Sequence, residues 1–125
     1  MEVTQNAVKP IMIGLQTHQD TGWIKLELLN GWKNYSESFT NEYNDVGYRV
    51  VNNVVYFRGL LCGVSATSTN IIRLPTSIVS DGVKIYNCFC SEGNTERINI
   101  DHFISTNRSQ NQMQWISLEG ISYPI

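Results

Sequence analysis

The chain has little charge and no long apolar run, and each shortage excludes a class of protein. Nine basic and eleven acidic residues among 125 give a net charge of −2, without the basic stripe that nucleic acids require. The longest apolar run is far shorter than the roughly 20 residues of a membrane span, and no signal-peptide pattern opens the sequence. We therefore expect no nucleic-acid partner and no membrane insertion.

Cysteine is also scarce. The three cysteines, Cys62, Cys88 and Cys90, are an odd number and cannot all be paired within one chain. Cys88 and Cys90 lie two apart on an expected strand, so their side chains share one face and fit a mutual disulfide poorly. Structural zinc takes four ligands at a recognisable spacing, which is missing here. We expect three reduced, buried thiols without a metal, in a protein made in a reducing cytosol.

Groups for catalysis are few. His18 and His102 are the two histidines, and no nucleophile elbow or zinc-protease motif occurs. Glu96 and Asp101 are the closest carboxylates on one expected strand, but their odd spacing places them on opposite faces rather than across one glycosidic bond. We expect no enzyme activity and no cofactor.

The chain does contain many short segments of period two, separated by Gly, Asn, Ser and Thr. Asn52-Asn53 suits a tight hairpin turn, and Pro75 ends the strand before it. Expected strands cover residues 23–28, two strands within 48–59, then 71–74, 83–90, 96–100, 103–105, 113–118 and 121–123. The pattern predicts an all-β antiparallel sandwich of jelly-roll or related Greek-key type, with about eight or nine short strands and no convincing helix.

We expect residues 22–125 to form this sandwich and residues 1–21 to be a linker, neck or edge segment. The N-terminal segment carries an apolar cluster between Val8 and Leu15. That cluster either packs on the same domain or contacts other copies of the chain.

Carbohydrate binding is the function that the residue inventory favours. Aromatic rings stack on the apolar faces of sugars, while charged and amide groups bind hydroxyls. Trp32 and Tyr35 share one loop, and a turn is expected at Asp101-His102. The candidate glycan site comprises Arg97, Asp101, His102, Arg108 and Trp115.

Several of these side chains also have a structural interpretation. Trp23 and Trp32 stand beside glycines and are interpreted as core residues. Tyr56 and Phe57 point to opposite faces of a central strand, and both can be buried in a sandwich that has neighbours. For Trp115 both interpretations stay open: its ring is either buried in the core or faces outward as a binding platform. Asp101-His102 could be written as metal ligands, but solvated turns often carry such pairs, and we expect no metal.

Five short motifs follow one another along residues 22–124: Trp23, Asn30-Gly31-Trp32, the hairpin over 48–59, Leu74-Pro75, and the segment 115–123, Trp-Ile-Ser-Leu-Glu-Gly-Ile-Ser-Tyr. In this order they resemble the C-terminal head domains of tail-fibre, baseplate and receptor-binding proteins of phages that infect Gram-positive bacteria. No binding residue carries over by motif.

The resemblance implies a homotrimeric sandwich head at the tip of the virion tail, in particles made in the host cytoplasm. Such heads bind cell-wall polysaccharide or teichoic acid without cleaving it, next to other tail or baseplate proteins. Two alternatives stay open: a baseplate scaffold domain that binds protein, and an accessory domain of a tail-associated cell-wall hydrolase.

Overall fold

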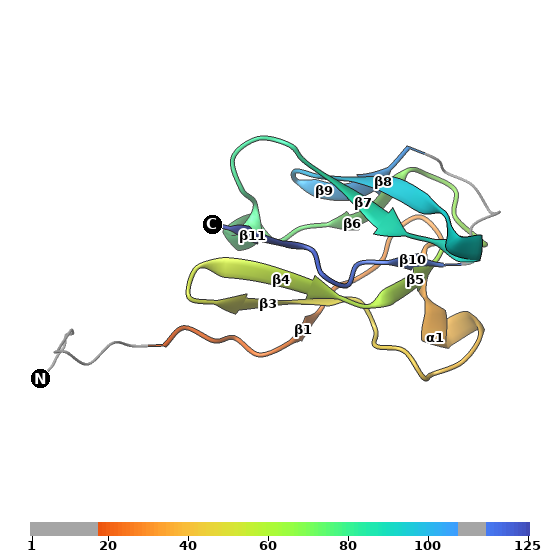
Figure 1. Cartoon of the computed structure of the whole chain (residues 1–125), viewed down its shortest axis with the longest axis horizontal. Helices are drawn as coiled ribbons and strands as arrows, with labels where there is room; N and C mark the ends of the chain where they lie inside the picture. Colours follow the sequence, from red (N-terminus) through yellow and green to blue (C-terminus); the bar gives the residue numbers. More distant parts are fainter. Residues whose placement is uncertain (1–17, 108–114) are drawn as a thin grey trace, which may run out of the picture.

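The structure is a computed structural model that describes residues 18–107 and 115–125. It is an antiparallel β-sandwich, which confirms the expected fold class (Figure 1). The strands in chain order are β1 (Ile24–Lys25), β2 (Lys33–Asn34), β3 (Gly47–Val51), β4 (Val54–Arg58), β5 (Leu60–Cys62), β6 (Asn70–Arg73), β7 (Lys84–Phe89), β8 (Thr95–Ile100), β9 (Phe103–Thr106), β10 (Ile116–Ser117) and β11 (Ser122–Pro124). One short helix, α1 (Tyr35–Ser38), and two 3-10 turns, η1 (Thr76–Ile78) and η2 (Ser91–Gly93), complete the described elements.

The strands form two main layers and a smaller sheet at one end. One layer has the strand order β1-β3-β4-β11, and the other has the order β6-β9-β8-β7. The smaller sheet, β10-β5-β2, lies beside α1 at the end of the sandwich opposite the C-terminus (Figure 1). β5 follows β4 after the single residue Gly59, so one stretch of chain passes from the first layer into the end sheet.

The central hairpin forms where the sequence predicted it. Asn52 and Asn53 both have positive φ, 49° and 64°, and asparagine tolerates this conformation better than most residues. Val51 then faces Val54 across the turn, and the register of β3 and β4 follows. The alternation sends Val50 and Phe57 into the core and Arg49 to the outer face.

The core lies between the two layers and is rich in branched side chains. Val55 of the first layer and Ile98 and Ile104 of the second are fully buried. Trp32 is also buried, and its indole N–H donates to the carbonyl of Ser68 at 2.8 Å. The interpretation of Trp32 as a core residue is therefore confirmed, and its polar atom has the partner that a buried indole requires.

The number of strands differs from the prediction, because the shortest strands have too few residues to show the period-two pattern. Residues 18–107 and 115–125 contain eleven strands instead of the expected eight or nine, and the unexpected ones, β2 and β5, are two and three residues long. The helix α1 was not expected either. It has four residues, and its first turn is closed locally by Glu37, whose carboxylate accepts from the Asn34 N–H at 3.0 Å.

All three cysteines are buried, as the sequence predicted for small core residues. Burial, with a smaller effect of neighbouring Cys90, raises the pKa of the Cys88 thiol to about 11. The thiolate is the reactive form, so this thiol should be inert at neutral pH.

We expect an aromatic disulfide reagent at pH 8 to modify none of the three thiols in the folded protein and all three after unfolding in urea. Absorbance of the released thiolate measures both numbers. Rapid modification of the native protein would contradict the burial. Fewer than three reactive thiols after unfolding, or stoichiometric zinc by elemental analysis, would contradict the reduced, metal-free state.

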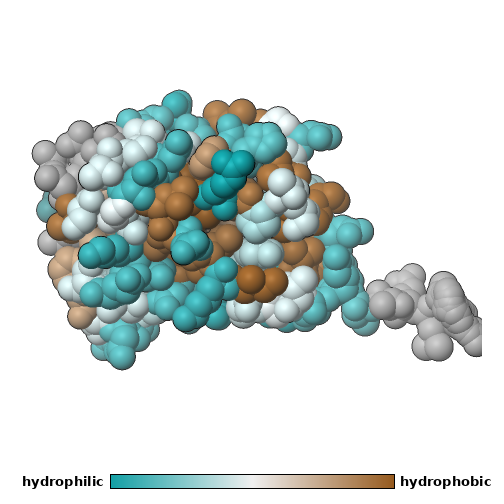
Figure 2. Space-filling view, turned by 180° about the vertical axis from the view of Figure 1, so that it is seen from behind, coloured by the Kyte–Doolittle hydropathy of each residue, from teal (hydrophilic) through white to brown (hydrophobic). Residues whose placement is uncertain are grey.

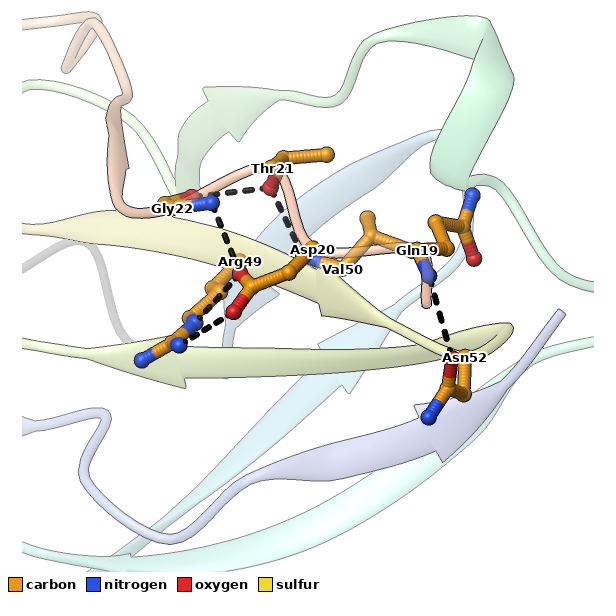
Figure 3. A network of polar contacts seen from close by, with 7 residues as sticks. All are labelled: Gln19, Asp20, Thr21, Gly22, Arg49, Val50 and Asn52. Atoms are coloured by element: carbon orange, nitrogen blue, oxygen red, sulfur yellow. Dashed lines mark hydrogen bonds and ion pairs between the residues drawn. The ribbon is translucent and has the colours of Figure 1, made fainter. Parts of the chain in front are cut away.

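A short N-terminal strap, residues 19–22, lies along the end of β3 (Figure 3). Asp20 receives two hydrogen bonds from the Arg49 guanidinium, at 2.6 and 2.9 Å. Arg49 and the Gly22 N–H together lower the pKa of Asp20 to about 2. Gln19 is bonded to Asn52 and Asn53 at the hairpin turn. The apolar cluster between Val8 and Leu15 lies outside the described residues, and the domain boundary near residue 22 stays a prediction.

Candidate functional site

The predicted turn at Asp101 and His102 joins β8 to β9. His102 is exposed, and its carbonyl accepts from the Leu74 N–H at 2.9 Å. The Asp101 carboxylate accepts from the Phe103 N–H at 2.9 Å. Asp101 therefore closes the turn, and only its remaining lone pairs are available to a ligand.

The other predicted site residues do not gather at this turn. Arg97 points outward from β8 and donates to the Asn107 side chain at 2.8 Å, while Arg108 lies outside the described residues. Trp115 is bonded to Ser91 just beyond β7, whereas the turn adjoins Lys84 at the start of β7. At about 3.3 Å per strand residue, these two ends are roughly 20 Å apart. A glycan site at the Asp101-His102 turn thus stays a prediction without Trp115 as its platform.

Trp115 instead belongs to an aromatic groove, the Trp115 groove, at the end of the sandwich that carries α1. The groove has a volume of about 510 Å³ and is lined by Glu42, Tyr43, Asn44, Leu60, Phe89, Trp115, Ser117 and Glu119. Trp115 is half-buried, while Phe89 is 69% exposed and Tyr43 is 51% exposed. The Trp115 ring is thus partly covered and still offers surface to a ligand.

Local contacts hold the backbone of Trp115 and the ring of Tyr43. Both the N–H and the C=O of Trp115 are bonded to Ser91, the N–H at 2.8 Å to the hydroxyl and the C=O at 3.1 Å to the Ser91 N–H. Tyr43 meets the ring of Tyr35 edge to face at 5.6 Å, and Phe39 stacks on the same ring at 4.7 Å. A smaller hollow of about 180 Å³ continues between Trp115, Tyr43 and Tyr35. Rings held in place lose little freedom when a ligand binds.

Polar groups in the groove can bind hydroxyls. Glu119 accepts from the Gly59 N–H at 2.9 Å, which fixes one oxygen of the carboxylate and leaves further lone pairs. Glu42 and Glu119 are both exposed.

A second groove, the Trp23 groove, lies on the outer face of the β1-β3-β4-β11 layer. It has a volume of about 520 Å³ and is lined by Trp23, Arg49, Val51, Tyr56, Phe57, Glu119, Gly120, Ile121 and Ser122. The interpretation of Trp23 as a core residue was wrong, because its side chain is 38% exposed. Of the two neighbouring residues of β4 that could both have been buried, Phe57 is buried and Tyr56 is exposed.

The sequence indicates the direction of the Phe89 side chain in the Trp115 groove but not that of Tyr43. Phe89 stands between Cys88 and Cys90, so burial of both cysteines already sends its ring outward. Tyr43 lies in a loop, where no periodicity indicates its direction, and only the contact with Tyr35 places it. The sequence contained no signal for that contact.

Apolar side chains are exposed outside the grooves as well. Val83 and Ile85 share the outer face of β7 with Phe89, and β7 is an edge strand of its sheet. Figure 2 shows apolar side chains gathered between polar ones on the rear face of the molecule. Within residues 18–107 and 115–125, no three His, Cys, Asp or Glu side chains are grouped as metal ligands. None of the helices in that part of the chain is long and apolar enough to cross a membrane.

Comparisons with known proteins give a class of fold and one named structure. Neither a protein-family model nor a curated protein sequence matches the chain. Among solved structures, the sandwich is similar to that of a phage receptor-binding protein. That structure is the receptor binding protein gp15 of Listeria phage PSA, with a TM-score of 0.64 and 18% sequence identity. The match covers 86% of this chain and 64% of that chain, and at this identity it shows the fold.

Proposed function

We propose that this chain is a host-recognition head of a phage tail, located at the tail tip, that binds a bacterial cell-surface glycan and does not cleave it. The observation that carries the proposal is the Trp115 groove, in which fixed aromatic rings lie next to carboxylate, amide and hydroxyl groups. This combination suits a sugar ring, which has one apolar face and a polar rim. The likeness to a receptor binding protein supports the proposal at the level of fold.

The ligand class we propose is cell-wall polysaccharide or teichoic acid. The described lining of the Trp115 groove contains two carboxylates and no Lys or Arg, which favours neutral or amine-bearing sugars over phosphate groups. Arg97, which is exposed on β8, offers an alternative surface for an anionic unit. We therefore expect a neutral or amine-bearing glycan to bind in the Trp115 groove and an anionic glycan to bind at the alternative surface.

The test is labelling of a panel of Gram-positive strains, Listeria included, with the fluorescent domain, followed by competition with wall polysaccharide extracted from a labelled strain. Labelling that the extract abolishes supports the proposal, and labelling of no strain contradicts it. The same walls are incubated with the domain and assayed for released reducing ends. Their release would contradict the non-enzymatic role and assign Glu42 and Glu119 as the residues to mutate first.

A scaffold role is the second candidate, and one observation favours it. Val83, Ile85 and Phe89 give edge strand β7 an exposed apolar face, and such edges readily pair with other chains. A head that binds tail or baseplate proteins through β7 would label no cells.

We propose that the head is a homotrimer, since closed symmetry would bury apolar surface that a monomer exposes. We expect the domain to have the mass of three chains in native solution, by sedimentation at micromolar concentration. Ile85→Asp, which places a charge on the exposed face of β7, should dissociate the trimer if β7 forms the contact. A monomer at high micromolar concentration would contradict the proposal.

A further inference from the structure

The Trp23 groove contains an aromatic platform that the core does not require. The Arg58 guanidinium lies over the Trp23 ring, 4.4 Å from the centroid, and the Arg49 guanidinium lies 5.9 Å from the same centroid. Arg49 is itself held in place by the two hydrogen bonds that its guanidinium donates to the Asp20 carboxylate (Figure 3). Cation–π contacts thus fix an exposed indole in one orientation, and a ring fixed in advance loses little freedom on binding.

The polar lining of the Trp23 groove suits an uncharged ligand with hydroxyls. Tyr56 adds a second exposed ring across from Arg49 in the β3–β4 ladder. Ser122 is exposed on β11, and Arg49 and Glu119 supply a donor and an acceptor at the sides. The lining contains one positively charged residue, Arg49, and one negatively charged residue, Glu119, so their formal charges cancel. Two rings with balanced polar groups fit a sugar better than an isolated anion.

The two grooves adjoin one another. Glu119 lines both of them, and it is the only residue they share in the described chain. Tyr56 of one groove and Leu60 of the other lie on the continuous stretch β4-Gly59-β5, roughly 13 Å apart at strand spacing. The shared wall is fixed, because the Leu118 N–H donates to the Gly59 carbonyl at 2.9 Å and the Phe57 N–H donates to the Ile121 carbonyl at 2.9 Å.

We propose that the Trp23 groove is a second carbohydrate subsite and that one extended glycan strand occupies both grooves, crossing Glu119. The proposal rests on the glycan-binding function proposed above and deepens it: the ligand is a polymer of several sugars rather than a single terminal sugar. Once one part of a glycan chain is bound in the first groove, binding of the next part in the second groove is intramolecular. The affinity therefore rises with the length of the glycan chain.

The experiment compares two probes from a strain that the domain labels: the extracted wall polysaccharide and its single repeating unit. Affinities for both are measured by titration calorimetry on the wild-type domain, Trp23→Ala, Tyr56→Ala and the control Val64→Ala. Val64 is exposed in the loop after β5 and lines neither groove. Thermal unfolding of each variant checks that the fold is retained, and Tyr56→Ala gives a second reading if Trp23→Ala is unstable.

We expect Trp23→Ala and Tyr56→Ala to weaken binding of the polysaccharide by about tenfold or more, with the affinity for the repeating unit little changed. Val64→Ala should change neither affinity. Equal polysaccharide affinity in the wild type and in both groove variants would overturn the second subsite while leaving the Trp115 site intact. If neither probe binds the wild-type domain, the proposed function fails first, so the two failures are distinguishable.

Discussion

Replacing Gly59 by alanine should destabilise the domain by about 3 kcal/mol or more, because two costs add at this position. Gly59 has φ +117°, which side-chain-bearing residues rarely adopt. A Cβ there would also lie 2.5 Å from the Val46 Cα and 2.7 Å from the Asp45 carbonyl oxygen. Both neighbours are backbone atoms, so neither can move aside without shifting β3.

Gly93→Ala is the matched control. Gly93 also has positive φ, +75°, but a Cβ there meets no atom within 4 Å. Its replacement should cost only the conformational strain, about 1 kcal/mol. Urea unfolding followed by tryptophan fluorescence measures both free energies. If the two variants unfold at the same urea concentration, the close approach of β3 to Gly59 is not what the structure describes.

Replacing Trp115 by alanine should reduce labelling of a bound strain by at least about tenfold, because the stacking platform of the groove is lost. Trp115 is half-buried, so the loss of stability should be moderate, and the melting temperature is measured alongside. Tyr43→Ala removes a more exposed ring from the same groove and should weaken labelling with less effect on folding.

Two variants in the same assay separate the competing sites. Val64→Ala removes an exposed apolar side chain outside the grooves and should label cells normally. Asp101→Ala tests the turn between β8 and β9, and we expect normal labelling because that turn lies at the other end of β7 from Trp115. Loss of labelling in Asp101→Ala with none in Trp115→Ala would transfer the site to the turn.

The fold was predictable because its main features depend on residues that are close together in the sequence. The Asn52-Asn53 turn and the valines on either side of it specify a hairpin without reference to the rest of the chain. The burial of Trp32 and the three cysteines also followed from local sequence. β2 and β5 escaped prediction because two or three residues show no period, and their pairing depends on partners distant in the chain.

The site was less predictable because it depends on which ends of the strands meet. Trp115 and Asp101 are near one another in the order of elements along the chain. The antiparallel arrangement of β7 and β8 nevertheless places them at opposite ends of the sandwich. Trp23 was assigned to the core from its neighbouring glycine, but its ring lies on the outer face under two guanidinium groups. Neither fact can be derived from period or propensity.

The strap over β3 also determines where the domain would yield under mechanical load. A pull on the chain ahead of Gln19 falls first on the Asp20–Arg49 ion pair and on the backbone bonds from Asn52 to Gln19 and from Thr21 to Val50. These contacts must be peeled from the hairpin before tension reaches β1. Because α1 and the Trp115 groove lie at the other end of the sandwich (Figure 1), the strap would absorb the force while the rings of that groove keep their positions.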